Sequence, residues 1–196
     1  MLVENVARET VSNENPLGLT KDVSEGSILE DDLTETTRWS DHTLVIPLLF
    51  NLYHGIELLV KGFLLITPGV VVKPTHSIQH LCRKFYTAYP NEIELHSFLR
   101  KYTEENQLPS LLREFLKVNS LTFADLYQAL RYPSDQDFVD MKYYVRLKYK
   151  GQQGISFFQE LHEAIRSVRP LAVQLGRSLE LGDMSPNPSS QRTAKK

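Results

Sequence analysis

The stretch that decides the fold is residues 43–66, which read TLVIPLLFNLYHGIELLVKGFLLI. Apolar side chains cover most of its circumference at helical spacing, which predicts a helix at the centre of a bundle. The stretch is also long enough to cross a bilayer. Glu57 and Lys61 lie in mid-span, however, where charges are costly in hydrocarbon. We therefore expect the core helix of a soluble protein.

Helix signals continue on the C-terminal side of this stretch. We expect further helices over 77–88, from Asn91, from Pro109, from Thr122 and over 155–181. Residues 142–150, KYYVRLKYK, alternate instead, with Val145, Leu147 and Tyr149 on one face and basic side chains on the other. That alternation is typical of a strand. The sequence therefore predicts an all-α helical bundle of five to six helices with a small basic β-hairpin before the last helix.

The two ends of the chain differ in composition from its middle. Residues 1–26 lack a sustained apolar period, and residues 183–196 are rich in Pro and Ser. We expect 1–26 to be disordered or loosely attached, 27–182 to form the folded domain and 183–196 to be a flexible tail. Ser27 is the expected cap of a short amphipathic helix at the start of the domain.

The charge is divided unevenly along the chain, whose formal net charge is −2. Residues 1–38 carry nine acidic and three basic side chains, a net of −6, so the other 19 bases and 15 acids give 39–196 a net of +4. The near-neutral total argues against a strongly basic nucleic-acid-binding protein, but the body of the chain keeps RNA binding open. The single cysteine, Cys82, excludes an intrachain disulfide and indicates a reducing, cytoplasmic location.

A polar stripe runs along the central helix. His54, Glu57 and Lys61 fall, with Asn51, within an arc of about 120°. Two interpretations are open. The stripe faces solvent, with Glu57 and Lys61 as a weak i,i+4 ion pair, or it lines a polar cleft that holds a ligand.

Two further motifs contain polar side chains that could bind a metal ion or a phosphate. His76 and His80 are four residues apart, but they have no matching second pair, so a helix-start role for His76 is favoured and we expect no metal or cofactor. Arg131 and Tyr132 precede Pro133, and an arginine fork there could bind phosphate or simply interact with the helix dipole.

The order of three motifs, LYHGIELLVKGFLL, THSIQHL and LRYPSD, resembles the HEPN domain, a helical nucleotide- and RNA-binding bundle. The resemblance covers about residues 44–180. It implies a nucleotide site that includes Glu57, Lys61, His76, Arg131 and Tyr132, to which the polar stripe adds His54. It also implies a homodimer. A place in a toxin–antitoxin or defence system, with a nucleotidyltransferase-like or defence-system partner, is a separate hypothesis.

The chain departs from the ribonuclease members of that family. They carry Arg-x4–6-His, whereas no His follows Arg131 within that range. Without that proton carrier, general acid–base cleavage lacks its usual group. We therefore expect a nucleotide- or RNA-binding or interaction module without nuclease activity. The alternative is a metal-independent endoribonuclease that uses Arg131 with an atypical base such as His54.

The basic hairpin is the expected RNA contact, through Lys142, Arg146, Lys148 and Lys150. Lysines that protect a solvated edge strand from aggregation explain the same residues equally well. A separate hypothesis concerns a protein partner: the acidic segment 1–38 would cover a basic groove on this chain or on that partner.

Overall fold

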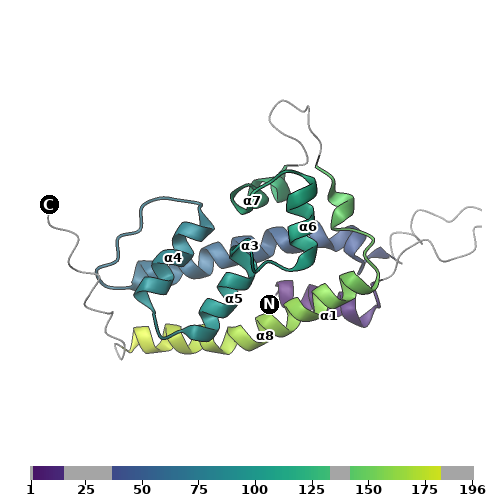
Figure 1. Cartoon of the computed structure of the whole chain (residues 1–196). Helices are drawn as coiled ribbons and strands as arrows, with labels where there is room; N and C mark the ends of the chain where they lie inside the picture. Colours follow the sequence, from purple (N-terminus) through teal and green to yellow (C-terminus); the bar gives the residue numbers. More distant parts are fainter. Residues whose placement is uncertain (1, 16–36, 133–141, 182–196) are drawn as a thin grey trace, which may run out of the picture. The chain divides into compact units, whose positions relative to one another are not determined.

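The computed structural model describes residues 2–15, 37–132 and 142–181, and these are helical throughout apart from their connections. The elements are α1 (Leu2–Ser12), α3 (Asp41–Ile66), α4 (Ile78–Ala88), α5 (Ile93–Thr103), α6 (Ser110–Val118), α7 (Phe123–Arg131), the 3-10 turn η1 (Tyr144–Arg146) and α8 (Gln152–Glu180) (Figure 1). The chain forms two compact units. The first comprises 1–51 and 109–165, and the second comprises 52–108 and 166–196.

The all-α prediction is confirmed, and the helices predicted within 37–132 and 142–181 are present. Their starts follow local signals. Ser77 caps α4 by accepting a hydrogen bond from the backbone N–H of His80. Thr122 and Asp125 form a capping box at the start of α7, in which the Thr122 N–H donates to Asp125 Oδ2 at 2.9 Å. Pro47 lies inside α3 without ending it.

Each unit has its own apolar core. The largest fully buried side chains of the second unit are Tyr53, Leu64, Leu81, Phe85, Leu95, Leu99 and Tyr102, and α4 and α5 lie next to each other there (Figure 1). The first unit buries Leu49, Leu111, Phe115, Leu147 and Phe158. At about 1.5–3 kcal/mol for each large apolar side chain, these cores supply most of the stabilisation.

Helix α3 is the one helix in 2–15, 37–132 and 142–181 that is long and apolar enough to cross a membrane. Its side chains pack in both units, since Leu49 and Tyr53 are fully buried. It also places Glu57 among the buried residues. These contacts are those of a core helix in a soluble protein, while the cytoplasmic location stays a prediction.

A buried polar network organises the first unit around Asp41. The Asp41 carboxylate is 1% exposed and accepts the backbone N–H groups of Tyr149 and Lys150, each at 2.7 Å. Asn15 donates from Nδ2 to Asp41 Oδ2 at 3.0 Å and accepts the Asp41 N–H at 2.6 Å. A Cβ added to Gly154 would lie 2.6 Å from Asn15 Nδ2 and 2.7 Å from Asp41 Oδ2. The network therefore ties the chain after α1 and before α8 to the start of α3.

Residues 142–150 do not form the predicted strand, so the basic β-hairpin is wrong for this segment. It contains η1 instead, and two of its backbone N–H groups bind Asp41 rather than a neighbouring strand. The expected apolar face is also missing, because Leu147 is fully buried whereas Val145 is 55% exposed. The predicted hairpin closure within 133–141 lies outside the described residues.

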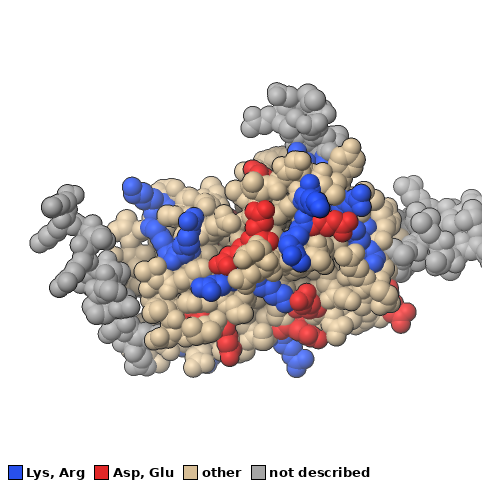
Figure 2. Space-filling view, in the orientation of Figure 1, with Lys and Arg blue, Asp and Glu red and all other residues tan. Residues whose placement is uncertain are grey.

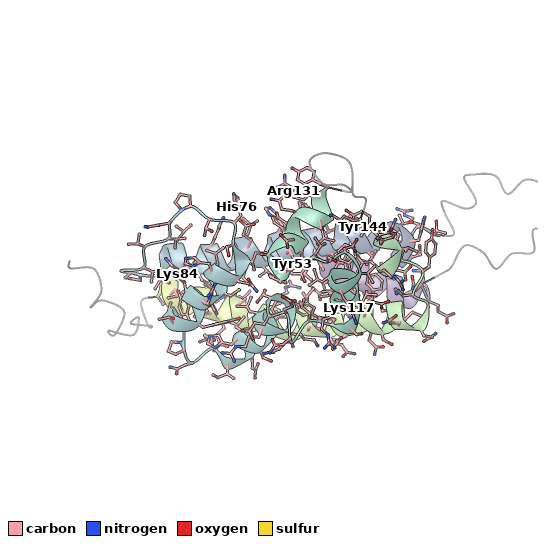
Figure 3. The ribbon with its side chains drawn as sticks, turned by 45° about the horizontal axis from the view of Figure 1, so that its top comes forward. Tyr53, His76, Lys84, Lys117, Arg131 and Tyr144 are labelled. Carbon is pink, nitrogen blue, oxygen red and sulfur yellow. The ribbon has the colours of Figure 1, made fainter. Side chains whose placement is uncertain are left out.

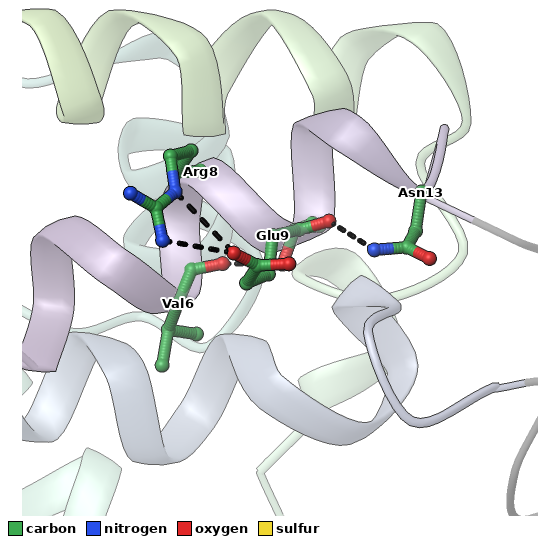
Figure 4. Close-up of polar contacts among 5 residues, drawn as sticks. Val6, Arg8, Glu9 and Asn13 are labelled. Carbon is green, nitrogen blue, oxygen red and sulfur yellow. Dashed lines mark hydrogen bonds and ion pairs between the residues drawn. The ribbon is translucent and has the colours of Figure 1, made fainter.

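Residues 2–15 differ from the expectation of a disordered or loosely attached segment. They form α1, in which Ala7 and Thr10 are fully buried. Local contacts add to this helix: Arg8 pairs with Glu9 at 3.0 Å, and Asn13 Nδ2 donates to the Glu9 carbonyl at 2.7 Å (Figure 4). The expected helix after Ser27 and the tail over 183–196 lie outside the described residues.

Candidate functional site

The second unit brings three of the predicted site residues together. Glu57 and Lys61 lie one turn apart on α3, and His76 lies in the segment that leads to α4. Lys61 Nζ donates to Glu57 Oε1 at 2.6 Å, and His76 Nδ1 is 2.9 Å from the same oxygen. We call this set the Glu57 cluster. The predicted i,i+4 pair is present, and His76 contacts the same carboxylate, while a nucleotide site formed by these residues stays a prediction.

Burial differs sharply across the Glu57 cluster. The Glu57 side chain is only 4% exposed, whereas those of Lys61 and His76 are 25% and 84% exposed. Burial opposes ionisation of Glu57, but the hydrogen bonds and charges of Lys61 and His76 together outweigh it and lower the Glu57 pKa. The carboxylate is therefore ionised at neutral pH, and it holds two donors at the surface of the unit.

The surroundings of the Glu57 cluster are cationic. No Asp or Glu occurs from residue 58 to residue 91, while Lys73, Arg83 and Lys84 occur there with Lys61. Lys84 Nζ donates to the Val71 carbonyl at 2.6 Å, which ties the segment before His76 to α4. Lys and Arg side chains gather over α4 in Figure 2, and Figure 3 labels Lys84 and His76.

The other predicted nucleotide-site residues are His54, Arg131 and Tyr132. His54 is exposed on α3, one turn before Glu57. Arg131 and Tyr132 belong to the first unit and form a pair of their own, with the guanidinium carbon 5.3 Å from the tyrosine ring centroid. Both are exposed. Their predicted role in a nucleotide site stays a prediction.

The first unit carries a second cationic surface, formed where η1 packs against α6. Its centre is Glu114, which accepts Arg146 Nη1 at 3.3 Å and lies 3.6 Å from Lys150 Nζ. Arg113 and Lys117 are exposed on α6 beside it. With Lys142 and Lys148, these residues make what we call the α6–η1 surface. Figure 2 shows Lys and Arg side chains over α6 around a small acidic area.

Aromatic side chains of the α6–η1 surface have unequal roles. Tyr143 is 63% exposed and Tyr149 is 46% exposed, with the Tyr149 ring 4.8 Å from that of His42. Tyr144 serves the fold instead, because it stacks on Phe115 at 5.8 Å and its hydroxyl donates to the carbonyl oxygens of Ala129 and Tyr132 (Figure 3). Two of the three tyrosines of this segment are therefore open to a ligand.

Sequence reasoning missed the acidic partners of the basic segment. Glu114 lies 32 residues before Arg146, and no pattern in the chain links the two. It also missed Arg113 and Lys117, although their i,i+4 spacing on the polar face of an amphipathic helix could have pointed to them. Lys142 likewise has a carboxylate nearby, since its charge helps to lower the pKa of Asp125 after the larger effect of the Thr122 hydrogen bonds.

Metal binding has no support in the described part of the chain, where no group of three His, Cys, Asp or Glu side chains is arranged to hold an ion. Comparisons with protein-family models, with curated proteins and with solved structures found no match. The resemblance to the HEPN domain therefore stays a prediction that rests on the motifs of this chain.

Proposed function

We propose that this chain is an RNA-binding module whose interface is the α6–η1 surface. The observation that carries the proposal is the concentration of six Lys and Arg side chains on α6 and on the segment 142–150, whose turn η1 packs against that helix. Glu114 lies among them and is shared by two of them, so the surface keeps a net positive charge. Phosphate contacts supply most of the affinity of such surfaces, and they release counterions on binding.

The ion pairs with Glu114 do not remove Arg146 and Lys150 from this role. The Arg146–Glu114 pair is exposed, and such pairs contribute about 0–1 kcal/mol, whereas the Lys150 side chain is only 14% exposed and adds its charge from beneath the surface. Arg146 also has five N–H donors, of which the contact to Glu114 uses one. A phosphate can therefore bind these side chains beside Glu114, which fixes their position before RNA arrives.

Exposed tyrosines favour single-stranded RNA as the ligand. Stacking of a base on an aromatic side chain contributes about 1–3 kcal/mol and tolerates any sequence. Tyr143 lies next to Lys142, and Tyr149 lies between Lys148 and Lys150. The segment therefore offers a ring beside each group of charges, although as an irregular turn rather than as a strand.

Fluorescence anisotropy with a short single-stranded RNA over a salt series tests the proposal. The double variant Arg113→Glu/Lys117→Glu is expected to weaken binding about tenfold or more and to lower the salt slope by about 1.4, the value for two lost phosphate contacts. Tyr143→Ala should weaken binding while leaving the slope unchanged, because a stacked ring releases no counterions.

The matched control for the α6 variant is Arg166→Glu/Arg177→Glu, which reverses two exposed charges on α8 in the second unit. The proposal fails if RNA affinity is undetectable at low salt, or if the control weakens binding as much as the α6 variant. In either case the α6–η1 surface is only a solvated, charged face.

A nucleotide at the Glu57 cluster is the second candidate function. Lys61 and His76 converge on one carboxylate oxygen, and the Lys61 ammonium has two further N–H donors that a phosphate could accept. Calorimetric titration with ATP, compared between the native chain and Lys61→Met, measures this. Equal affinities would exclude Lys61 from a nucleotide site.

The family resemblance and the missing Arg-x4–6-His motif lead to two further proposals. The first is that the chain forms a homodimer, which light scattering tests by measuring the mass in solution. The second is that the chain lacks nuclease activity. Incubation with mixed RNA tests the second. Cleavage by the native chain that disappears in Arg131→Ala would favour the endoribonuclease alternative.

A further inference from the structure

The tautomer of His76 follows from its partner. The Glu57 carboxylate is ionised and buried, so Oε1 can only accept hydrogen bonds. The proton in the 2.9 Å contact must therefore belong to His76 Nδ1. In the neutral ring, Nε2 then carries the free electron pair. The contact with Glu57 thus presents Nε2 as a nucleophile in a fixed orientation.

The position of this nitrogen limits the reactions that it could serve. The His76 side chain is 84% exposed, at the edge of a segment held to α4 by Lys84. A base that acts on a small substrate works in a site that excludes water. A group that is handed from one protein to another must instead protrude, so that the active site of the partner can enclose it. His76 protrudes in this way, as a residue that passes a group to a partner protein must.

The charge around His76 suits one kind of group in particular. Lys61 lies against the same carboxylate oxygen, and the stretch from residue 58 to residue 91 holds four bases and no acid. A doubly charged phosphoryl group on His76 would therefore gain favourable interactions. A neutral acyl group would gain none of them.

We propose that His76 Nε2 is a phosphoryl-acceptor site that takes its phosphoryl group from an acyl phosphate or a phosphoramidate. The Nε2 electron pair attacks phosphorus and forms an N–P bond. The P–O or P–N bond to the leaving group breaks, and the electron pair leaves with the carboxylate or with the amine, the latter from a phosphoramidate whose bridging nitrogen is already protonated. The Nδ1 proton stays in its hydrogen bond, and Glu57 offsets the positive charge that develops on the ring.

Glu57 and Lys61 act as positioning residues for this step. Glu57 fixes the ring and its tautomer, as a carboxylate does for a metal-bound or catalytic histidine. Lys61 holds the Glu57 carboxylate at 2.6 Å and adds a charge beside the incoming phosphoryl group. The proposal does not depend on RNA binding, which concerns residues of the other unit.

His80 provides a control within the same molecule. It lies four residues after His76 and is also exposed. Within the described residues, its imidazole makes no hydrogen bond to a carboxylate. The two histidines therefore share the basic segment and the solvent exposure, and they differ in the bond to Glu57.

The experiment is phosphorylation of the full chain by potassium phosphoramidate at neutral pH, followed by ³¹P NMR and peptide mass spectrometry. His76 is expected to be labelled about tenfold faster than His80, at Nε2, with an acid-labile product. Labelling of His76 that is no faster than that of His80 overturns the proposal. This comparison needs no variant, so it does not depend on a substitution that folds.

Glu57→Gln tests the positioning role. The amide keeps the shape of the side chain but not its charge, so the rate at His76 should fall to about that at His80, while the rate at His80 stays unchanged. Glu57→Asp should recover part of the difference if the charge is responsible. Unchanged labelling of His76 in Glu57→Gln would contradict the role assigned to Glu57, whatever the result of the RNA measurements.

Discussion

Helix α3 carries two buried carboxylates, and a different kind of partner satisfies each one. Asp41 is 1% exposed in the first unit and Glu57 is 3% exposed in the second. Asp41 is held by backbone N–H groups and by the Asn15 amide, none of which titrates near neutral pH. Glu57 is held by Lys61 and His76, whose side chains reach solvent.

The difference separates a structural carboxylate from a reactive one. Burying a charge is costly in both places, and both sites offset the cost with several hydrogen bonds. At Asp41 the donors are parts of the fold, so the bonds fix the path of the chain. At Glu57 the donors are side chains that a ligand or a reagent can reach. The hydrogen bonds there hold reactive groups in place at the surface.

The largest expected effect comes from removing Asp41. Asp41→Ala leaves the backbone N–H groups of Tyr149 and Lys150 without their acceptor and removes one of the two acceptors of Asn15 Nδ2, which also donates to the Gly151 carbonyl at 3.2 Å. The free energy of unfolding should fall by about 3–4 kcal/mol. Urea denaturation measures it. Asp125→Ala is the matched control, because that carboxylate accepts a backbone N–H in an exposed capping box and its loss should cost only about 1 kcal/mol. Equal losses would mean that burial is irrelevant at Asp41.

A smaller effect is expected from crowding the same network. Gly154→Ala puts a Cβ within 2.7 Å of both Asn15 and Asp41, so their bonds must shift, at a cost of about 2 kcal/mol. Gly55→Ala in α3 is the control, since a Cβ there meets nothing within 4 Å and alanine favours a helix by about 1 kcal/mol. Thermal unfolding measures the stability change in both variants. If Gly154→Ala is no less stable than Gly55→Ala, the network adjusts to the added methyl group without cost, and the prediction is wrong.

The smallest effect is expected at Glu57, and it depends on pH. Because the folded pKa of Glu57 is lowered, its contribution is fully present above the unfolded pKa of about 4.3 and is lost as the pH falls through the folded value. Glu57→Gln should therefore destabilise the fold at pH 7 and do so less at pH 3. Glu104→Gln, which removes an exposed contact 3.6 Å from Arg100, is the control. An identical loss at both pH values would show that the charge of Glu57 does not stabilise the fold.

Helical periodicity and capping residues were sufficient to predict the helices from α3 to α8, but not α1. The apolar run over 43–66 and the capping residues Ser77 and Thr122 are local signals, and local hydrogen bonds satisfy them. The i,i+4 pair of Glu57 and Lys61 is local in the same sense. Its burial is not, because exposure depends on what packs over the helix.

The failures come from contacts between distant parts of the chain. The alternation in 142–150 is a valid strand signal, but Asp41 takes two backbone N–H groups of this segment from more than 100 residues away. The polar composition of 1–26 likewise hides Asn15, which is 1% exposed because Asp41 binds it. Buried polar side chains that find partners by tertiary contact leave no periodic trace in a sequence.

The glycine at position 154 has an evolutionary consequence. Because a Cβ there collides with both Asn15 and Asp41, a larger residue becomes acceptable only after one of those two has already changed. A substitution at position 15 or 41 must therefore come before one at position 154, so the three positions do not change independently. Among homologues, we expect positions 15, 41 and 154 to co-vary as a set. Positions 57, 61 and 76 should instead vary according to whether the homologue keeps the function of the Glu57 cluster.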